Sequence, residues 1–229
     1  MSGSDLLMMR APLASHSLSR RQGLRRLALG VAAPLLAALL SSGCDQKGLN
    51  PMTPSGPRFQ GVDITGAQYA QKLSLPDTTG RIRTLAEFKG KVVVVFFGFT
   101  QCPDICPTTM TELAEVKRRL GPQGERLQGV FVSVDPERDT DAVLAEYIRA
   151  MDPSFVALRG SVQQVTDAAR EFKVFFQKVP SQDGKSYTMD HTAGSYVFDP
   201  QGRVRLFVRY GSGVDALSSD IKLLLDEKP

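Results

Sequence analysis

Two mainly apolar runs, residues 92–97 and 127–134, dominate the hydrophobic pattern of the chain. The first run consists only of valine and phenylalanine, without polar alternation, which is expected of a strand buried on both faces of a parallel sheet. Shorter runs at residues 155–158, 195–199 and 203–208 predict further strands. Pro-Gln-Gly separates the last two runs, and this turn sequence predicts that they form a hairpin.

Four segments between and after these runs carry apolar residues at helical spacing. The first spans residues 107–120, and the other three follow predicted N-caps at Thr140, Ser161 and Ser212. Gln164 completes a capping box with Ser161. The predicted apolar faces are Met110, Leu113, Val116 and Leu120, then Val143, Leu144, Tyr147 and Ile148, then Val162, Val165, Ala169 and Phe172, and finally Val214, Leu217, Ile221 and Leu224.

The remaining segments complete a recognisable order of elements. Residues 73–85 predict an N-terminal hairpin whose turn contains Asp77 and Gly80, and residues 174–179 an extended segment followed by a polar loop. Strand and helix then alternate until a hairpin and a last helix close the domain. This order predicts an α/β, thioredoxin-like fold: a central mixed β-sheet flanked by helices, with an N-terminal hairpin.

The sequence at the start of the chain predicts a leader followed by a tether. Residues 20–26 form a basic segment and residues 27–40 an apolar one, shorter than the roughly 20 residues that a permanent membrane span needs. This pattern predicts an export signal. Residues 19–24 resemble a twin-arginine signal with glycine where phenylalanine is preferred, so the general and the twin-arginine export routes both stay open.

Cys44 ends the leader in a sequence that resembles a bacterial lipobox. Gly43 precedes it as a small residue, although Ser41 replaces the usual leucine, and Asp45 resembles the residue that keeps such lipoproteins on the inner membrane. The alternative is an uncleaved signal anchor in which Cys44 is incidental. Both interpretations predict anchoring at the periplasmic face of the bacterial inner membrane. We therefore expect a leader at 1–43, a flexible tether at 44–61 and a folded domain at 62–229.

The distribution of charge along the chain argues against a nucleic-acid-binding function. Residues 1–43 hold five arginines and one aspartate, which accounts for the whole formal charge of +4. The rest of the chain is formally neutral, so its composition gives no reason to expect nucleic-acid binding.

Cys102 and Cys106 lie where the run at 92–97 passes into a predicted helix. Their spacing of four puts both sulfurs on one side, and the helix N-terminus favours thiolate and lowers a thiol pKa. An unpaired structural role is disfavoured in an exported domain, and a disulfide across so short a loop stabilises weakly. Redox dithiols of thioredoxin type have two intervening residues rather than three. A reactive dithiol, a metal site, or both remain open.

His191 is the only histidine after the leader. With the two cysteines it makes a soft set of three ligands, whereas structural zinc needs a fourth. Cuprous copper accepts low coordination and prefers thiolate, so the set favours copper. His191 can serve only if the predicted loop at 188–192 folds over the start of the cysteine helix. The alternative for a lone histidine is a surface position.

Two acidic residues, Asp135 and Asp104, are interpreted as something other than metal ligands. Asp135 follows the second buried strand, where it could tune the thiolates or His191 from outside the ligand shell, or simply begin the turn with Pro136. Asp104 is expected to be an exposed carboxylate near the helix N-terminus rather than a ligand. Met110 is expected in the core.

Three segments together closely resemble the Sco/SenC family. They are residues 97–107 (FGFTQCPDICP), 132–140 (VSVDPERDT) and 190–202 (DHTAGSYVFDPQG), and the resemblance runs from about Gln71 to the C-terminus. It implies a thioredoxin-like domain that binds one copper ion, Cu(I) or Cu(II), through Cys102, Cys106 and His191. Family members help to assemble the CuA centre of cytochrome c oxidase by delivering copper, by reducing the receiving cysteines, or by both. Threonine at position 192, where serine is common, is a departure from the family pattern that leaves the three implied ligand residues unchanged.

The leading hypothesis is therefore an extracytoplasmic, membrane-tethered copper metallochaperone whose partner is the CuA-bearing subunit of cytochrome c oxidase. The alternative is a thiol–disulfide oxidoreductase acting through Cys102 and Cys106 on that subunit or on other exported proteins. A peroxiredoxin-like peroxidase is disfavoured because the second cysteine lies too close to the first.

Overall fold

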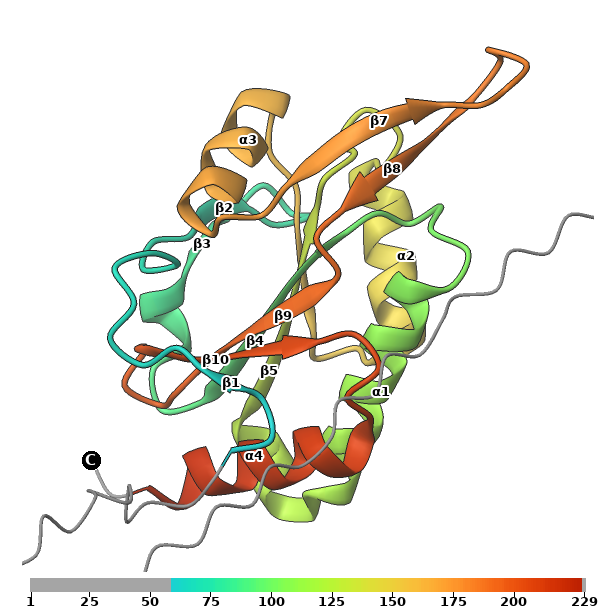
Figure 1. Cartoon of the computed structure of the whole chain (residues 1–229). Coiled ribbons are helices and arrows are strands. Elements are labelled where there is room, and N and C mark those ends of the chain that lie inside the picture. The colour runs from blue at the N-terminus through green and yellow to red at the C-terminus, as the bar shows by residue number, and fades with distance from the viewer. Residues whose placement is uncertain (1–58, 228–229) are drawn as a thin grey trace, which may run out of the picture. The chain divides into compact units, whose positions relative to one another are not determined.

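The computed structural model describes residues 59–227, which are built around a six-stranded sheet with the order β1-β10-β9-β4-β5-β6 (Figure 1). The central strand β4 (Val92–Gly98) runs parallel to β5 (Leu127–Ser133) and antiparallel to β9 (Gly194–Phe198). The sheet is thus mixed, as predicted. Its other strands are β1 (Val62–Asp63), β6 (Val156–Leu158) and β10 (Val204–Arg209).

Helices lie on both sides of this sheet. In Figure 1, α1, α2 and α4 lie to one side of the strands and α3 lies on the other, next to the β2–β3 hairpin. These α-helices are α1 (Ile105–Arg119), α2 (Asp141–Met151), α3 (Val162–Glu171) and α4 (Val214–Asp226), and the 3₁₀ turns are η1 (Leu85–Phe88) and η2 (Gly121–Arg126). The arrangement is the thioredoxin-like α/β architecture that the order of elements predicts.

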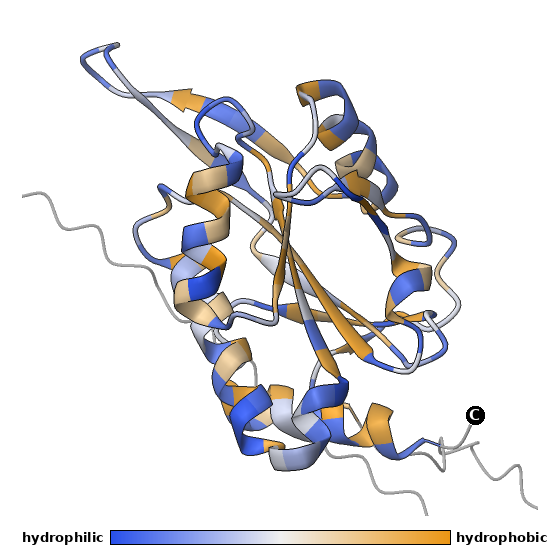
Figure 2. Cartoon of the chain, turned by 180° about the vertical axis from the view of Figure 1, so that it is seen from behind, coloured by the Kyte–Doolittle hydropathy of each residue, from blue (hydrophilic) through white to orange (hydrophobic). Residues whose placement is uncertain are grey.

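The core lies on both faces of β4, because every residue of that strand is buried. Successive side chains of a strand point to opposite faces. Accordingly, the Phe97 ring packs against Phe172 at the end of α3, at 5.2 Å between centroids, whereas the Phe96 ring faces Phe131 at 6.2 Å. Figure 2 shows the central strands as mostly hydrophobic and the helices as alternating bands of hydrophobic and hydrophilic residues.

Two hairpins stand outside the main sheet. β2 (Ser74–Pro76) and β3 (Ile82–Thr84) form the predicted N-terminal hairpin. β7 (Phe176–Pro180) and β8 (Tyr187–His191) form a second hairpin that extends away from the sheet in Figure 1. The prediction of a loop at 188–192 is wrong for most of that range, because residues 187–191 are a strand. Their largely polar sequence hid the strand, since only one residue of it is fully buried.

Two of the three predicted N-caps are confirmed. Thr140 accepts a hydrogen bond from the Val143 amide, and Ser161 makes a full capping box with Gln164. The third prediction is wrong, because the N-cap of α4 is Gly213. Its φ of 82° lies in the left-handed region, which glycine reaches without strain, and the preceding Ser212 hydroxyl donates to a carbonyl of its own turn instead.

The predicted apolar faces of α2 and α3 are each too wide. Val143 and Val162 are 42 % and 52 % exposed, whereas Leu144 and Val165 are fully buried. A helix packs one stripe on a sheet, and residues spaced four apart, such as Leu144 and Ile148, fill that stripe. Val143 lies about 100° away around the axis and therefore faces solvent.

Among residues 59–227, no helix is both long and apolar enough to cross a membrane. The predicted leader, the tether up to residue 58 and Cys44 lie outside the described residues.

Candidate metal centre

Cys102, Cys106 and His191 come together at the start of α1. One ligand atom from each residue lies within 4.8 Å of the other two. Ions bound by sulfur and nitrogen lie about 2.0–2.3 Å from each ligand, so ligand atoms around one ion are at most about 4.6 Å apart. The trio therefore matches the span of a single metal ion with little movement. Within residues 59–227 it is the one cluster of three or more potential ligands of this kind.

The junction between β4 and α1 places the two cysteines. β4 ends at Gly98 and α1 begins at Ile105, so Cys102 lies in the connecting loop and Cys106 in the first helical turn. The Cys106 amide donates to the Cys102 sulfur over 3.4 Å. One of the helical N–H groups without an intrahelical partner therefore points at a sulfur, as the sequence predicts.

Gly98 makes room for this arrangement. A Cβ atom at Gly98 would lie 2.9 Å from the Cys106 sulfur and 2.8 Å from the Phe96 ring. Such contacts are shorter than real Cβ atoms make, so a larger residue would push the thiol or the ring away. The glycine is required here by close approach rather than by a turn.

His191 reaches the cysteines from the end of β8. Its Nε2 lies 3.5 Å from the Cys106 Sγ, and its Nδ1 lies 3.2 Å from the Thr192 carbonyl oxygen. A proton on Nδ1 satisfies that carbonyl and leaves the Nε2 lone pair facing the sulfur, which is how a histidine is usually held for a metal. The rings of Phe96 and Phe99 stand edge-on to the imidazole, each at 5.9 Å between centroids.

Burial shifts the pKa values of two of the three ligands. It raises the pKa of Cys106 well above its usual range, and a backbone hydrogen bond from Phe99 offsets only part of that effect. The prediction that the helix start lowers the thiol pKa is therefore wrong for Cys106 in the metal-free protein, because desolvation outweighs the helix dipole. Burial also lowers the pKa of His191, so the imidazole is neutral at pH 7 and free to act as a ligand.

A buried carboxylate that the sequence did not single out holds the cysteine loop. Asp139 is fully buried and accepts hydrogen bonds from the Thr100 amide and hydroxyl and from the Ser133 hydroxyl. It thereby joins the loop before Cys102 to the end of β5. Burial raises the pKa of Asp139. The signal in the sequence was an acidic residue closing the turn after a buried strand.

Asp135 lies near the centre but makes no hydrogen bond to a ligand. It is 1 % exposed, and its carboxylate accepts from the Tyr187 hydroxyl at 2.9 Å and from the Arg138 guanidinium. Its route to His191 runs through Tyr187, four residues earlier on the same strand. Asp104 is exposed and accepts from the Thr108 hydroxyl at 3.2 Å. Met110 is fully buried, as predicted.

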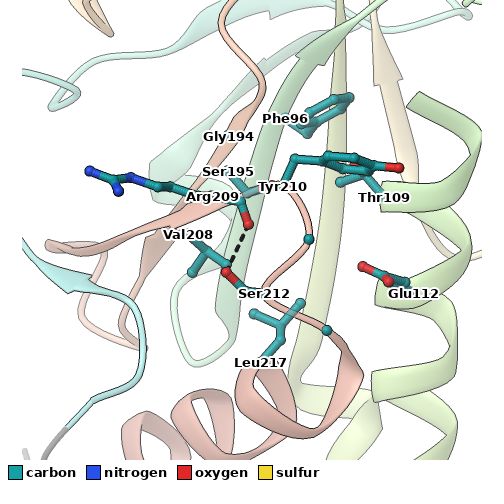
Figure 3. A pocket seen from close by; sticks show the side chains of 12 residues that line it. Phe96, Thr109, Glu112, Gly194, Ser195, Val208, Arg209, Tyr210, Ser212 and Leu217 are labelled. Atoms are coloured by element: carbon teal, nitrogen blue, oxygen red, sulfur yellow. Dashed lines mark hydrogen bonds between the residues drawn. The ribbon is translucent and has the colours of Figure 1, made fainter. Parts of the chain in front are cut away.

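A small cavity lies beside α1, between the strand ends and the loop that precedes α4 (Figure 3). Phe96, Thr109 and Tyr210 contribute to its lining, and the Ser212 hydroxyl donates to the Arg209 carbonyl at its edge. Its volume of about 20 Å³ is close to what one water molecule needs. The cavity is too small for an organic substrate.

The fold and this centre define a class: thioredoxin-like proteins with a Cys-Cys-His ligand set at the start of the first long helix. The description SCO1/SenC belongs to the family profile that matches residues 62–226. The chain therefore belongs to the SCO1/SenC family, as the three sequence segments indicate.

The chain is similar to relatives from mitochondria and bacteria. It is 39 % identical over 141 residues to "Protein SCO2 homolog, mitochondrial" of Bos taurus, covering 61 % of this chain and 52 % of that protein. It is 35 % identical over 158 residues to the "SCO2-like protein" of Rickettsia felis, covering 68 % of this chain and 77 % of that protein. The match thus spans about half the length of the mitochondrial relative.

Solved structures show the same fold. Bradyrhizobium japonicum ScoI, with copper bound, is 37 % identical with a TM-score of 0.60, covering 66 % of this chain and 96 % of that one. Apo Sco1 from Thermus thermophilus is 38 % identical with a TM-score of 0.65, covering 73 % and 97 %.

Proposed function

We propose that this protein binds one copper ion through Cys102, Cys106 and His191 and acts as a metallochaperone in the assembly of the CuA centre of cytochrome c oxidase. The observation that carries the proposal is the meeting of three soft ligand atoms within 4.8 Å, from residues up to 89 positions apart in the chain. Two sulfurs and one neutral imidazole nitrogen favour copper over hard cations, and three ligands leave the ion open to exchange.

The residues of the centre have distinct tasks in this function. Cys106 must lose its thiol proton when the ion is captured, because burial keeps that thiol protonated in the metal-free protein. His191 offers Nε2 without losing a proton. Cys102 is partly exposed and Cys106 is buried, so an acceptor protein reaches the ion from the Cys102 side. Ligand exchange through Cys102 then moves the ion to the acceptor.

Relatives support the choice of metal. The solved structures of ScoI from Bradyrhizobium japonicum and of yeast Sco1, 37 % and 32 % identical to this chain, are both described as copper-bound. The family resemblance supports the CuA-bearing subunit as the partner. The proposal includes both oxidation states of the bound copper, Cu(I) and Cu(II).

The location follows from the leader. An export signal at 1–43, with either a lipid on Cys44 or a retained signal anchor, tethers the domain to the periplasmic face of the inner membrane. Residues 44–61 are then the tether, and its last two residues are held to the domain because the Gln60 and Gly61 amides donate to Asp220. Mass spectrometry of the mature N-terminus decides between the two anchors, since only the lipoprotein begins at a diacylated Cys44.

Metal analysis of the reduced protein tests the copper site. We expect about one copper per chain for the wild type, and loss of tight binding in Cys102→Ser, Cys106→Ser and His191→Ala. Asp104→Asn is a matched control, because Asp104 lies between the cysteines and is exposed but supplies no ligand. Full, tight copper in His191→Ala would overturn the ligand assignment, as would zinc in preference to copper in the wild type.

A thiol–disulfide oxidoreductase is the second candidate, and the asymmetry of the two free thiols favours it. The partly exposed Cys102 can attack a partner disulfide as thiolate and form a mixed disulfide. Cys106 then attacks the Cys102 sulfur, which releases the second partner thiol and leaves a Cys102–Cys106 disulfide. The net change is two electrons and two protons passed to the partner.

Reduction of a disulfide in an oxidised peptide that carries the two CuA cysteines tests this activity. It needs Cys102 and Cys106 but not His191, so His191→Ala should keep the activity and lose copper. If His191→Ala loses both, the two functions share one site and cannot be separated as proposed.

A further inference from the structure

The inward face of β8 (Tyr187–His191) carries three side chains with different contacts. Residues two apart on a strand share a face, so Tyr187, Met189 and His191 point the same way. Met189 is 6 % exposed, His191 reaches Cys106 and Tyr187 reaches Asp135. The position of His191 over the cysteines thus depends on how this strand is held.

Packing beneath the hairpin is incomplete. A cavity of about 130 Å³ lies between the β7–β8 hairpin, α3 and the turn after β5. Met189, Phe176, Val134 and Val165 line it. Most residues of β7 are exposed as well. Apolar contacts alone therefore leave the hairpin room to shift.

Arg138, in the turn after β5, supplies polar contacts that hold the hairpin in place. Its guanidinium lies 3.7 Å from the centre of the Tyr187 ring, and its Nη1 donates to the Tyr187 carbonyl oxygen at 2.7 Å. Its Nε donates to Asp135, which also accepts from the Tyr187 hydroxyl. Arg138 thus contacts the ring and the backbone carbonyl of Tyr187 directly, and it is linked to the Tyr187 hydroxyl through Asp135.

The same guanidinium also reaches the cysteine loop. Its Nη1 donates to the Gln101 side-chain oxygen at 3.1 Å, and Gln101 immediately precedes Cys102. The next residue in the turn, Asp139, holds Thr100. The turn after β5 therefore contacts both chain segments that carry ligands, from between them.

A second ion pair reinforces the outer side of the hairpin. Lys178 of β7 pairs with Glu137 in the same turn and lies 4.8 Å from the Tyr187 ring centre. Both partners are about half exposed, so this pair contributes little by itself. The side chain of Arg138 is 21 % exposed and that of Asp135 is 1 % exposed, so their pair is screened less.

We propose that Arg138 is a positioning residue that fixes the His191 strand relative to the Cys102 loop and thereby slows the release of the metal. The metal part of this inference rests on the proposed function, whereas the structural part concerns the metal-free protein. Among residues 59–227, the hydrogen-bond and ion-pair partners of the Arg138 side chain are Asp135, Gln101 and Tyr187, none of which is a proposed ligand. It acts through Tyr187 on one side and Gln101 on the other.

The test compares Arg138→Gln and Tyr187→Phe with the control Arg170→Gln in the purified full chain. Within the described part of the chain, Arg170 pairs with Asp167 on its own helix and with no other acidic residue, so the control removes an arginine and an ion pair away from the centre. Tyr187→Phe keeps the ring and removes only the bond to Asp135. If circular dichroism shows that Arg138→Gln does not fold, Tyr187→Phe replaces it as the test variant.

The first readout needs no metal. Hydrogen exchange at residues 187–191 should accelerate about tenfold in Arg138→Gln, the effect of losing one hydrogen bond to a charged group. The ¹⁵N shifts of the His191 ring should move toward those of a mixture of tautomers, because the ring loses its fixed contact with the Thr192 carbonyl. Tyr187→Phe should give a smaller change of the same kind, and Arg170→Gln none. Unchanged exchange and ring shifts in both test variants would overturn the proposal.

The second readout is the rate at which a Cu(I) chelator removes copper. We expect removal to be about tenfold faster in Arg138→Gln at unchanged stoichiometry, and unchanged in Arg170→Gln. Altered exchange without copper binding in the wild type would contradict the proposed function and leave the structural part standing. Copper bound with an unaltered release rate would overturn the role of Arg138 and leave the proposed function standing.

Discussion

Burial makes the two cysteines different chemical groups although they are only four residues apart. Cys106 is fully buried in the first turn of α1, while Cys102 is partly exposed in the loop before α1. Burial raises the pKa of the Cys106 thiol, and in the proposed function this thiol is the fixed ligand while the exposed Cys102 meets the partner. Neither role follows from the sequence spacing, because exposure is set by residues far along the chain.

The raised pKa of Cys106 predicts a pH dependence of copper affinity. The thiol stays protonated from pH 6 to beyond the range in which an ordinary thiol ionises, so binding must displace its proton, and this group alone makes affinity rise about tenfold per pH unit over that range. His191, whose pKa is lowered, is already neutral at pH 7 and adds no step between pH 7 and 8. Competition titrations with a chelator of known pH dependence measure the slope. An affinity that stops rising above about pH 9, where an unshifted thiol is already ionised, would contradict the raised pKa of this thiol.

Replacing Asp139 by alanine or by asparagine should lower the free energy of unfolding by different amounts. Asp139→Ala leaves the Thr100 amide and two hydroxyls without their acceptor in a buried site and should lower the free energy of unfolding by about 2–4 kcal/mol. Asp139→Asn keeps an acceptor for Thr100 and can donate to the Ser133 hydroxyl, so its cost should be below about 1 kcal/mol. Urea unfolding of the metal-free protein at pH 7 measures both. Equal losses would show that the negative charge, rather than the acceptors, stabilises the loop.

At the scale of elements, the centre is the meeting of one strand–helix junction with one strand end. The junction from β4 to α1 supplies the two cysteines, and the end of β8 supplies the histidine. Close packing at Gly98 lets the first turn of α1 lie directly against β4.

Gly98→Ala tests this close packing against a matched control. The new methyl group would meet Cys106, Phe96 and Phe131, so we expect a loss of about 1–3 kcal/mol in stability and at least about tenfold weaker copper binding. Gly129→Ala on β5 is equally crowded, with a Cβ 2.7 Å from the Phe155 ring, but lies away from the cysteines. It should cost similar stability and leave copper affinity unchanged. Equal effects of both variants on copper would contradict a local role for Gly98.

The same scale shows what the sequence can and cannot predict. The buried run of β4 and the helix after it could be predicted, because both faces of a central strand must be apolar and a helix on a sheet needs an apolar stripe. β8 could not, since its contacts to Asp135 and Cys106 are made by polar side chains that show no hydrophobic period. The N-cap of α4 was missed for a related reason, because Gly213 acts through its backbone φ rather than through a side chain.

At the scale of the whole molecule, sheet order places the ligands at one edge. β4 and β5 are adjacent and parallel, so the Cys102 loop and the turn that starts at Asp135 both follow carboxyl ends at the same edge. The described chain begins beside α4, where the Gln60 and Gly61 amides donate to the buried Asp220, while the β7–β8 hairpin extends from the other end of the sheet (Figure 1). The ligand trio could be predicted from residue types. The supporting residues Arg138, Asp139 and Tyr187 could not, because only the folded sheet brings their segments together.

X-ray absorption at the copper edge of the Cu(I)-loaded protein tests the central claim most directly, because it reports the atoms bound to the ion. We predict two sulfur ligands and one nitrogen ligand in the wild type, loss of this spectrum in His191→Ala because that variant no longer holds copper tightly, and an unchanged spectrum in Asp104→Asn. A wild-type spectrum without two sulfurs, or one that His191→Ala leaves unaltered, would contradict the assignment of Cys102, Cys106 and His191 as the copper site.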